Sequence, residues 1–140
     1  MKILVAVDGS ACGIRAARYV CKTFGKRDAK AQVTLINVAP ALPAGLARLL
    51  GAEEVKQYHE EYGTQALRKA HGEFTRSRMT CKQVVVVGPP ADALVAFAQK
   101  GRFQLIVMGS HGYGALKGLL LGSVVTRVLS QASAPVLVVR

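Results

Sequence analysis

Short apolar runs alternate along this chain with longer segments in which apolar residues recur every three or four positions. The runs are rich in Val, Ile and Leu, which is typical of strands buried on both faces of a parallel sheet; they cover residues 2–7, 32–38, 82–87, 104–108 and 136–139. The segments with helical spacing cover residues 11–25, 53–79, 91–100 and 123–131. This alternation predicts an α/β fold: a doubly wound five-stranded parallel sheet with helices on both faces, in a single domain spanning 1–140.

The order of the strands decides where such a sheet binds a ligand. If the order is 3-2-1-4-5, it reverses between the first and the fourth strand, and ligands bind at the carboxyl ends of the strands at such a reversal. Asp8 ends the first strand and Gly109 ends the fourth. We therefore expect these two residues to face one crevice.

Two other features of the pattern leave alternatives open. Residues 39–51 are apolar, contain two prolines and a glycine, and are longer than a usual strand-to-helix connection. We expect a loop there, which either packs on the domain surface or forms a flap over a ligand or part of a subunit contact. His59 and His71 match no metal-binding spacing, so we expect them at the surface or partly packed. The buried stripe of the long helix is expected to comprise Val55, Tyr58, Tyr62, Ala66, Leu67, Ala70 and Phe74.

The charge of the chain indicates an anionic ligand. The formal net charge is +11, and no acidic residue follows Asp92. The carboxyl-terminal part is therefore cationic, which suits a polyphosphate, although a solvated basic surface would have the same composition. Basic residues without interleaved aromatic residues are a weak signal for nucleic acid.

Composition also bears on the compartment. No apolar run reaches the roughly 18 residues that a membrane-spanning helix needs. Residues 1–3 lead directly into a strand, without a signal-peptide pattern. Three cysteines without paired spacing do not indicate a disulfide framework. We therefore expect a cytoplasmic protein with no membrane partner.

The strand at 104–108 leads through a glycine-rich loop into the helix that begins near Ser123. Glycines let the backbone approach a ligand closely, and the unpaired N–H groups of a helix's first turn attract an anion. Ser123 can add a hydroxyl, either as the N-cap or as a phosphate ligand. The Walker pattern GxxxxGK[ST] is absent, which excludes a P-loop NTPase. The segment therefore predicts a phosphate site of a different kind.

The glycines of this segment form a long spaced motif, Gly109-x2-Gly112-x9-Gly122-Ser123. With the opening residues 5–10 and the closing residues 134–139, the motif resembles the nucleotide-binding branch of the universal stress protein family, over essentially the whole chain. The resemblance implies a Rossmann-like fold, an ATP site, a homodimer joined through the last strand, and a regulatory role in stress or dormancy.

The resemblance also implies roles for individual residues. Asp8 is expected near the ribose and adenine, Val38 beside the adenine, and Met108 and Gly109 against the nucleoside. The phosphates are expected at Gly112, Gly122, Ser123 and Val124.

Five further assignments belong to the same expected site. Val7 and Ser10 flank Asp8 in the opening motif. His111 is expected as a loop contact, with acid–base catalysis as the alternative, and Arg127 is expected to reach either a phosphate or solvent. Asp8, the sole acid expected near the site, is the candidate Mg²⁺ ligand.

These observations predict an ATP-binding regulatory protein of the stress response, homodimeric, with slow or no hydrolysis. The pattern contains no evident carboxylate and lysine set for phosphoryl transfer, so we assign no catalytic residue and expect at most a weak ATPase. One alternative is a Mg²⁺-dependent ATPase or nucleotide hydrolase that uses Asp8. The other is a nucleotide-free basic module that binds a protein or a nucleic acid.

Overall fold

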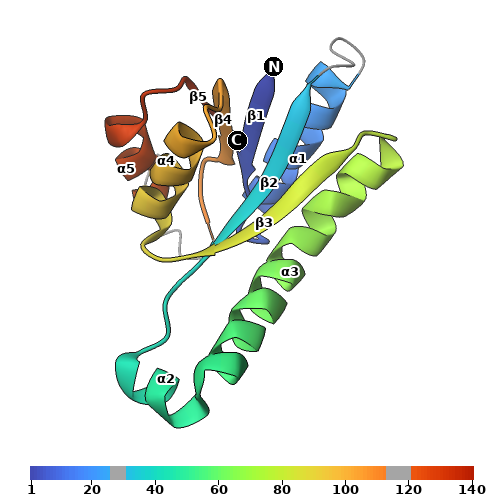
Figure 1. Ribbon diagram of the computed structural model, residues 1–140. Coiled ribbons are helices and arrows are strands. Elements are labelled where there is room, and N and C mark those ends of the chain that lie inside the picture. Colours follow the sequence, from blue (N-terminus) through green and yellow to red (C-terminus); the bar gives the residue numbers. More distant parts are fainter. Residues whose placement is uncertain (26–30, 113–120) are drawn as a thin grey trace.

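The computed structural model describes residues 1–25, 31–112 and 121–140. The middle of the predicted glycine-rich loop, 113–120, lies outside the described residues. Strands and helices alternate through most of the described chain, as the pattern predicts (Figure 1). In chain order they are β1 (Lys2–Ala6), α1 (Ala11–Phe24), β2 (Gln32–Ala39), α2 (Ala44–Leu50), α3 (Ala52–Arg76), β3 (Cys81–Val87), α4 (Pro90–Lys100), β4 (Leu105–Gly109), α5 (Ser123–Gln131) and β5 (Val136–Val139).

The sheet is parallel throughout and has the order β3-β2-β1-β4-β5, which confirms the predicted topology. Ala6 of β1 is paired with Ile36 of β2 on one side and with Met108 of β4 on the other. β1 and β4 therefore end within one residue of the same level, β2 continues beyond them to Ala39, and the strand order reverses between β1 and β4.

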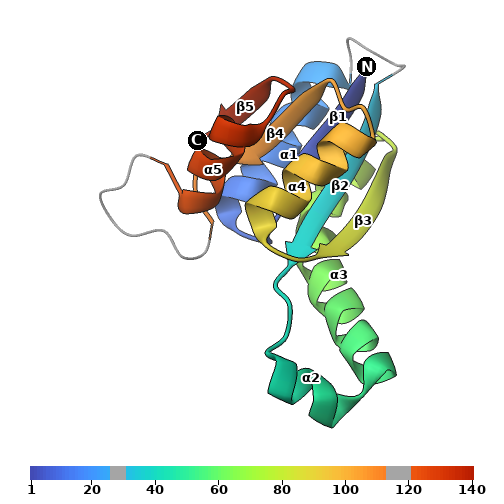
Figure 2. The same ribbon diagram turned by 60° about the vertical axis from the view of Figure 1, so that its left-hand side comes forward.

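Two helical layers cover the sheet, and each encloses its own core (Figures 1 and 2). Side chains that alternate along a strand point to opposite faces, so Val5 and Leu35 pack with α1 and α3, whereas Leu4, Ile36 and Ile106 pack with α4 and α5. Burial on both faces explains why the central strands are continuous apolar runs.

One partly buried ion pair links α1 to α3. Arg18 donates two hydrogen bonds to Glu73, at 3.2 and 2.9 Å, and Arg76 also donates to this carboxylate. The Glu73 side chain is only 10% exposed. The hydrogen bond from Arg18 outweighs the cost of burial and lowers the pKa of Glu73 below its ordinary value.

The prediction of a loop over residues 39–51 is wrong, because α2 occupies Ala44–Leu50. Pro43 precedes the helix with a φ of −52°, and the helix consists largely of Ala, Leu and Arg, which are strong helix formers. Residues 40–62, which comprise α2, its connections and the beginning of α3, extend beyond the carboxyl ends of the strands (Figures 1 and 2). We call residues 40–62 the arm.

The expected buried stripe of α3 is only partly correct. It is buried from Leu67 to Phe74, but Tyr58 and Tyr62 are exposed, because this half of α3 lies beyond the sheet. His59 was expected at the surface or partly packed and is instead 7% exposed. Its Nε2 lies 3.2 Å from the carbonyl oxygen of Pro40, a contact that ties the start of the arm to α3. None of the helices in the described ranges is long and apolar enough to cross a membrane.

Candidate functional site

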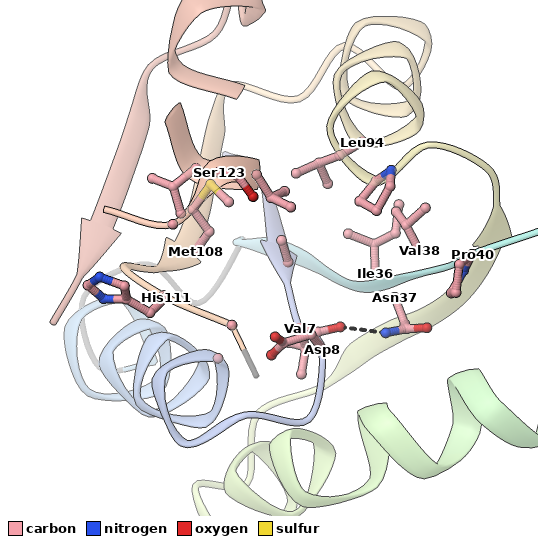
Figure 3. A pocket seen from close by; sticks show the side chains of 18 of the residues that line it. Val7, Asp8, Ile36, Asn37, Val38, Pro40, Leu94, Met108, His111 and Ser123 are labelled. Atoms are coloured by element: carbon pink, nitrogen blue, oxygen red, sulfur yellow. Dashed lines mark hydrogen bonds between the residues drawn. The ribbon is translucent and has the colours of Figure 1, made fainter. Parts of the chain in front are cut away.

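A cavity of about 480 Å³ opens at the carboxyl ends of β1, β2 and β4, where the strand order reverses (Figure 3). This volume lies within the range of small-molecule sites. The lining residues come from the three strand ends, from the beginnings of α1, α4 and α5, and from the arm. They are Ala6, Val7, Asp8, Gly13, Ile36, Asn37, Val38, Pro40, Tyr62, Pro90, Leu94, Met108, Gly109, His111, Gly112, Gly122, Ser123, Val124 and Val125.

One end of the cavity is apolar. Val38 and Pro40 at the end of β2 lie across the opening from Ser123 and His111 (Figure 3). Ile36 lies beside Val38, Leu94 of α4 adds another apolar side chain, and Met108 lies on the opposite side near Ser123 (Figure 3). An apolar wall of this kind can hold a flat apolar group such as an aromatic base.

The other end carries the beginning of α5. Gly122 is the N-cap and makes no side-chain cap hydrogen bond; its own N–H donates to the carbonyl oxygen of Ser110 at 2.9 Å. Ser123 is therefore the first residue of the helix and not its N-cap, so its hydroxyl remains a candidate phosphate ligand. The N–H groups of a helix's first turn lack intrahelical acceptors and carry the positive end of the helix dipole, and the first turn of α5 lines the cavity. This end suits an anion.

Two glycines make room for the carboxylate of Asp8. A Cβ added at Gly112 would lie 2.6 Å from Oδ2 of Asp8, and one added at Gly13 would lie 3.2 Å from Oδ1. Oδ1 also accepts a hydrogen bond from the N–H of Ser10 at 2.9 Å, across the turn in which Gly9 has a φ of 87°. Asp8 is thus held at the cavity wall, and it is the only carboxylate among the described lining residues.

Gly109 lines the cavity but also has a packing role that the sequence did not reveal. A Cβ at this position would lie 2.5 Å from the backbone carbon of Cys12 and 2.8 Å from its carbonyl oxygen. Glycine is therefore required here because the first turn of α1 packs against the end of β4.

The sequence analysis overlooked Asn37, which is buried at the end of β2. Its Nδ2 donates to the carbonyl oxygen of Val7 at 2.8 Å and links the ends of β2 and β1 (Figure 3). Its Oδ1 is buried without a hydrogen-bond partner in the described part of the chain. An amide side chain flanked by the apolar Ile36 and Val38 was the available sequence signal.

Ten of the twelve residues expected at the site line the cavity, and two do not. Ser10 is buried: its Oγ caps α1 by accepting from the N–H of Gly13 at 3.2 Å, and it lies 3.5 Å from the carbonyl oxygen of His111. Arg127 points to Asp92, with hydrogen bonds of 3.1 and 3.0 Å to its carboxylate. The sequence did not reveal nine of the lining residues: Ala6, Gly13, Ile36, Asn37, Pro40, Tyr62, Pro90, Leu94 and Val125.

Asp8 and His111 are the carboxylate and the imidazole among the described lining residues. His111 Nδ1 lies 3.1 Å from Oγ of the neighbouring Ser110. The described residues contain no group of three His, Cys, Asp or Glu side chains that could hold a metal ion. A cation at Asp8 would therefore need most of its ligands from a bound molecule or from water.

Comparison with known proteins decides the family. The profile of the Universal stress protein family matches residues 1–140. The chain belongs to the universal stress protein family. Universal stress protein MJ0531 of Methanocaldococcus jannaschii is 33% identical over 140 residues, covering 99% of this chain and 81% of that protein.

Solved structures of the universal stress protein family share the fold. The structure of MJ0577, another universal stress protein of M. jannaschii, has a TM-score of 0.81 and 30% identity, covering 99% of this chain and 94% of that one. A universal stress protein solved in complex with cAMP has a TM-score of 0.69 and 26% identity, covering 100% and 96% of the two chains.

Proposed function

We propose that this chain binds ATP in the cavity and acts as a regulatory protein of the stress response, with slow or no hydrolysis. The observation that carries the proposal is the joining, in one cavity, of an apolar wall with the open N-terminus of α5. An adenine nucleotide has the matching shape, with a flat base at one end and an anion at the other.

In this proposal the base lies against Val38 and Met108. Asp8 faces the ribose, and the phosphates lie on the backbone of Gly112 and of 122–124. Small residues at these positions leave the amide groups accessible. A universal stress protein with 26% identity binds the adenine nucleotide cAMP, which supports the class of ligand.

Slow turnover follows from the side chains at the phosphate end. No lysine or arginine belongs to the lining in the described ranges, and Arg127 is paired with Asp92. Phosphoryl transfer needs cations or metal ions to stabilise the charge that develops on the transferred group. Backbone amides hold the ground state without supplying that additional charge.

The second candidate is a Mg²⁺-dependent nucleotide hydrolase, favoured by one observation. Asp8 presents an exposed carboxylate, held by Ser10, toward the cavity. Together with phosphate oxygens this carboxylate provides part of a Mg²⁺ site.

Calorimetry with ATP tests the proposal. We expect a Kd in the micromolar range, about −8 kcal/mol of binding free energy, and its loss in Gly122→Val, whose side chain would occupy the phosphate end. Gly72→Val is the matched control, because a Cβ at Gly72 meets nothing within 4 Å. Equal binding by the two variants, or no binding by the wild type, would contradict the proposal and favour the nucleotide-free basic module.

An ADP-release assay with and without Mg²⁺ separates a regulator from an enzyme. We expect turnover far below 1 per second, the lower end of ordinary enzyme rates. Mg²⁺-dependent turnover at or above this rate, lost in Asp8→Asn, would establish the hydrolase instead.

We further propose a homodimer joined through β5, as the family resemblance implies. Support comes from the position of β5 at one edge of the sheet. Unpaired N–H and C=O groups at a sheet edge are a template for pairing with another strand.

A further inference from the structure

The arm carries half of the exposed large hydrophobic side chains in the described part of the chain. None of the residues of α2 is buried, and Leu49 is 83% exposed. Ten large hydrophobic side chains are exposed in the described ranges, and five of them belong to the arm: Leu46, Leu49, Leu50, Tyr58 and Tyr62. Exposed apolar residues gathered in this way mark an interaction surface.

The arm also differs in charge from the rest of the chain. It contains four of the eight acidic residues, Glu53, Glu54, Glu60 and Glu61, and only two cations, Arg48 and Lys56. Its net charge is thus −2, which leaves +13 on the other residues of a chain whose total is +11. In the part of the chain that the structure describes, none of these four carboxylates forms an ion pair, whereas Glu73 and Asp92 do.

A basic surface with the complementary composition lies on the outer face of α1. Arg15, Arg18 and Lys22 are exposed along this helix at spacings of three and four residues, so they share one face. Tyr19, 40% exposed, lies among them. Arg76 of α3 extends the surface, because it shares the carboxylate of Glu73 with Arg18. We call these five residues the α1 face.

We propose that the arm of one molecule docks on the α1 face of a second copy of this chain. Charge complementarity within one sequence is the argument for a second copy, because the basic surface that an acidic, apolar arm requires is present on the same chain. Leucines of α2 would pack around Tyr19, and the arm's carboxylates would pair with Arg15 and Lys22. If two copies exchange arms about a two-fold axis, the contact is made twice and the assembly closes.

The shortness of α2 is an independent physical reason to expect that the arm docks on another surface. A seven-residue helix is not stable alone in water, and α2 contacts α3 but buries none of its residues. Docking would bury the leucines of α2 and supply the tertiary packing on which helices of this length depend.

Sedimentation velocity over a concentration series tests the proposal. The background variant is Val138→Pro, which blocks pairing through β5 and leaves the arm contact as the source of dimers. We expect a dimer at 50 mM salt whose Kd rises at least tenfold at 500 mM, because screening weakens exposed ion pairs. In the same background, Leu46→Ser with Leu49→Ser should raise the Kd at least tenfold. Leu129→Ser is the matched control and should leave the Kd unchanged. Leu129 lies on α5 and is 44% exposed, close to the 43% of Leu46.

A charge exchange identifies the partner surface. Glu53→Lys with Glu54→Lys, and separately Arg15→Glu with Lys22→Glu, should each raise the Kd at least tenfold, and an equimolar mixture of the two variants should recover association. Circular dichroism establishes that each variant is folded. A monomer at all concentrations at 50 mM salt would overturn the proposal. So would a dimer indifferent to the leucine variants, or failure of the mixed variants to associate.

Discussion

Replacing each of two glycines at the site by alanine should have unequal consequences for stability: a clear loss at Gly109 and little change at Gly122. Gly109 ends β4, and the Cβ of an alanine there would lie 2.5–2.8 Å from atoms of Cys12 in α1. Gly122 is the N-cap of α5, and a Cβ there would meet its nearest neighbours, His111 and Ser110, at 3.5 Å. The first distances are far inside van der Waals contact, and the second is ordinary contact.

The magnitudes follow from these distances. At Gly109 the obstacle is mainly helix backbone, so β4 and α1 must move apart, and overpacking of this kind costs about 1–3 kcal/mol. At Gly122 the φ of −70° suits alanine. The entropic gain of about 0.4–1 kcal/mol in the unfolded chain offsets a loss of similar size at the N-cap. The net change at Gly122 should therefore stay within about 1 kcal/mol.

Thermal unfolding followed by circular dichroism measures both variants. For a chain of 140 residues, about 1 kcal/mol changes Tm by about 2–4 °C. We expect Gly109→Ala to lower Tm by about 2–12 °C and Gly122→Ala to change it by less than about 4 °C. A Gly109→Ala protein that melts with the wild type, or a Gly122→Ala protein that is the less stable of the two, would refute the packing argument.

Two further predictions concern the α1–α3 pair and the sheet edge. The pKa of Glu73 is lower in the folded protein than in the unfolded chain, so its contribution to stability is present above the unfolded pKa and is lost as the pH falls through the folded pKa. Glu73→Gln should therefore lower Tm by several degrees at pH 7, with a difference from the wild type that shrinks toward pH 3; a constant difference across this range would contradict the assigned cause. At the edge, Pro135 and Val139 direct their carbonyl groups to β4, so the N–H of Val138 points away from the sheet. Val138→Pro should remove the association that is insensitive to salt in sedimentation velocity without changing Tm by more than a few degrees, and an unchanged assembly would argue against a dimer through β5.

Local sequence patterns predicted most of the secondary structure of the fold. Apolar runs of strand length alternating with helical spacing predicted the five strands, and their bounds agree within one or two residues. The spacing of Gly109, Gly112 and Gly122 predicted residues that line the cavity, because a strand, a close turn and a helix start are encoded by residues near one another in the chain. The strand order, by contrast, does not follow from these patterns, because 2-1-3-4-5 is equally compatible with right-handed crossovers and one reversal; the structure decides it.

Tertiary structure decided which side chains meet. Arg127 is paired with a residue 35 positions away, and the amide of Asn37 reaches a carbonyl group 30 positions away. No periodicity along the chain reports such contacts. The environment of Glu73, and hence the lowered pKa of its carboxyl group, likewise exists only after α1 and α3 pack together.

In the arm, the sequence did not determine the secondary structure either. The sequence of 39–51 combines prolines, a glycine and strong helix formers, and both a loop and a short helix are compatible with it. Along α3 the apolar stripe continues to Tyr58 and Tyr62, but the sheet that would cover them ends earlier. Sequence by itself determined which residues are apolar and at what period they recur. Only the tertiary structure decided which of those apolar faces are buried against another element, because burial depends on where distant segments end in space.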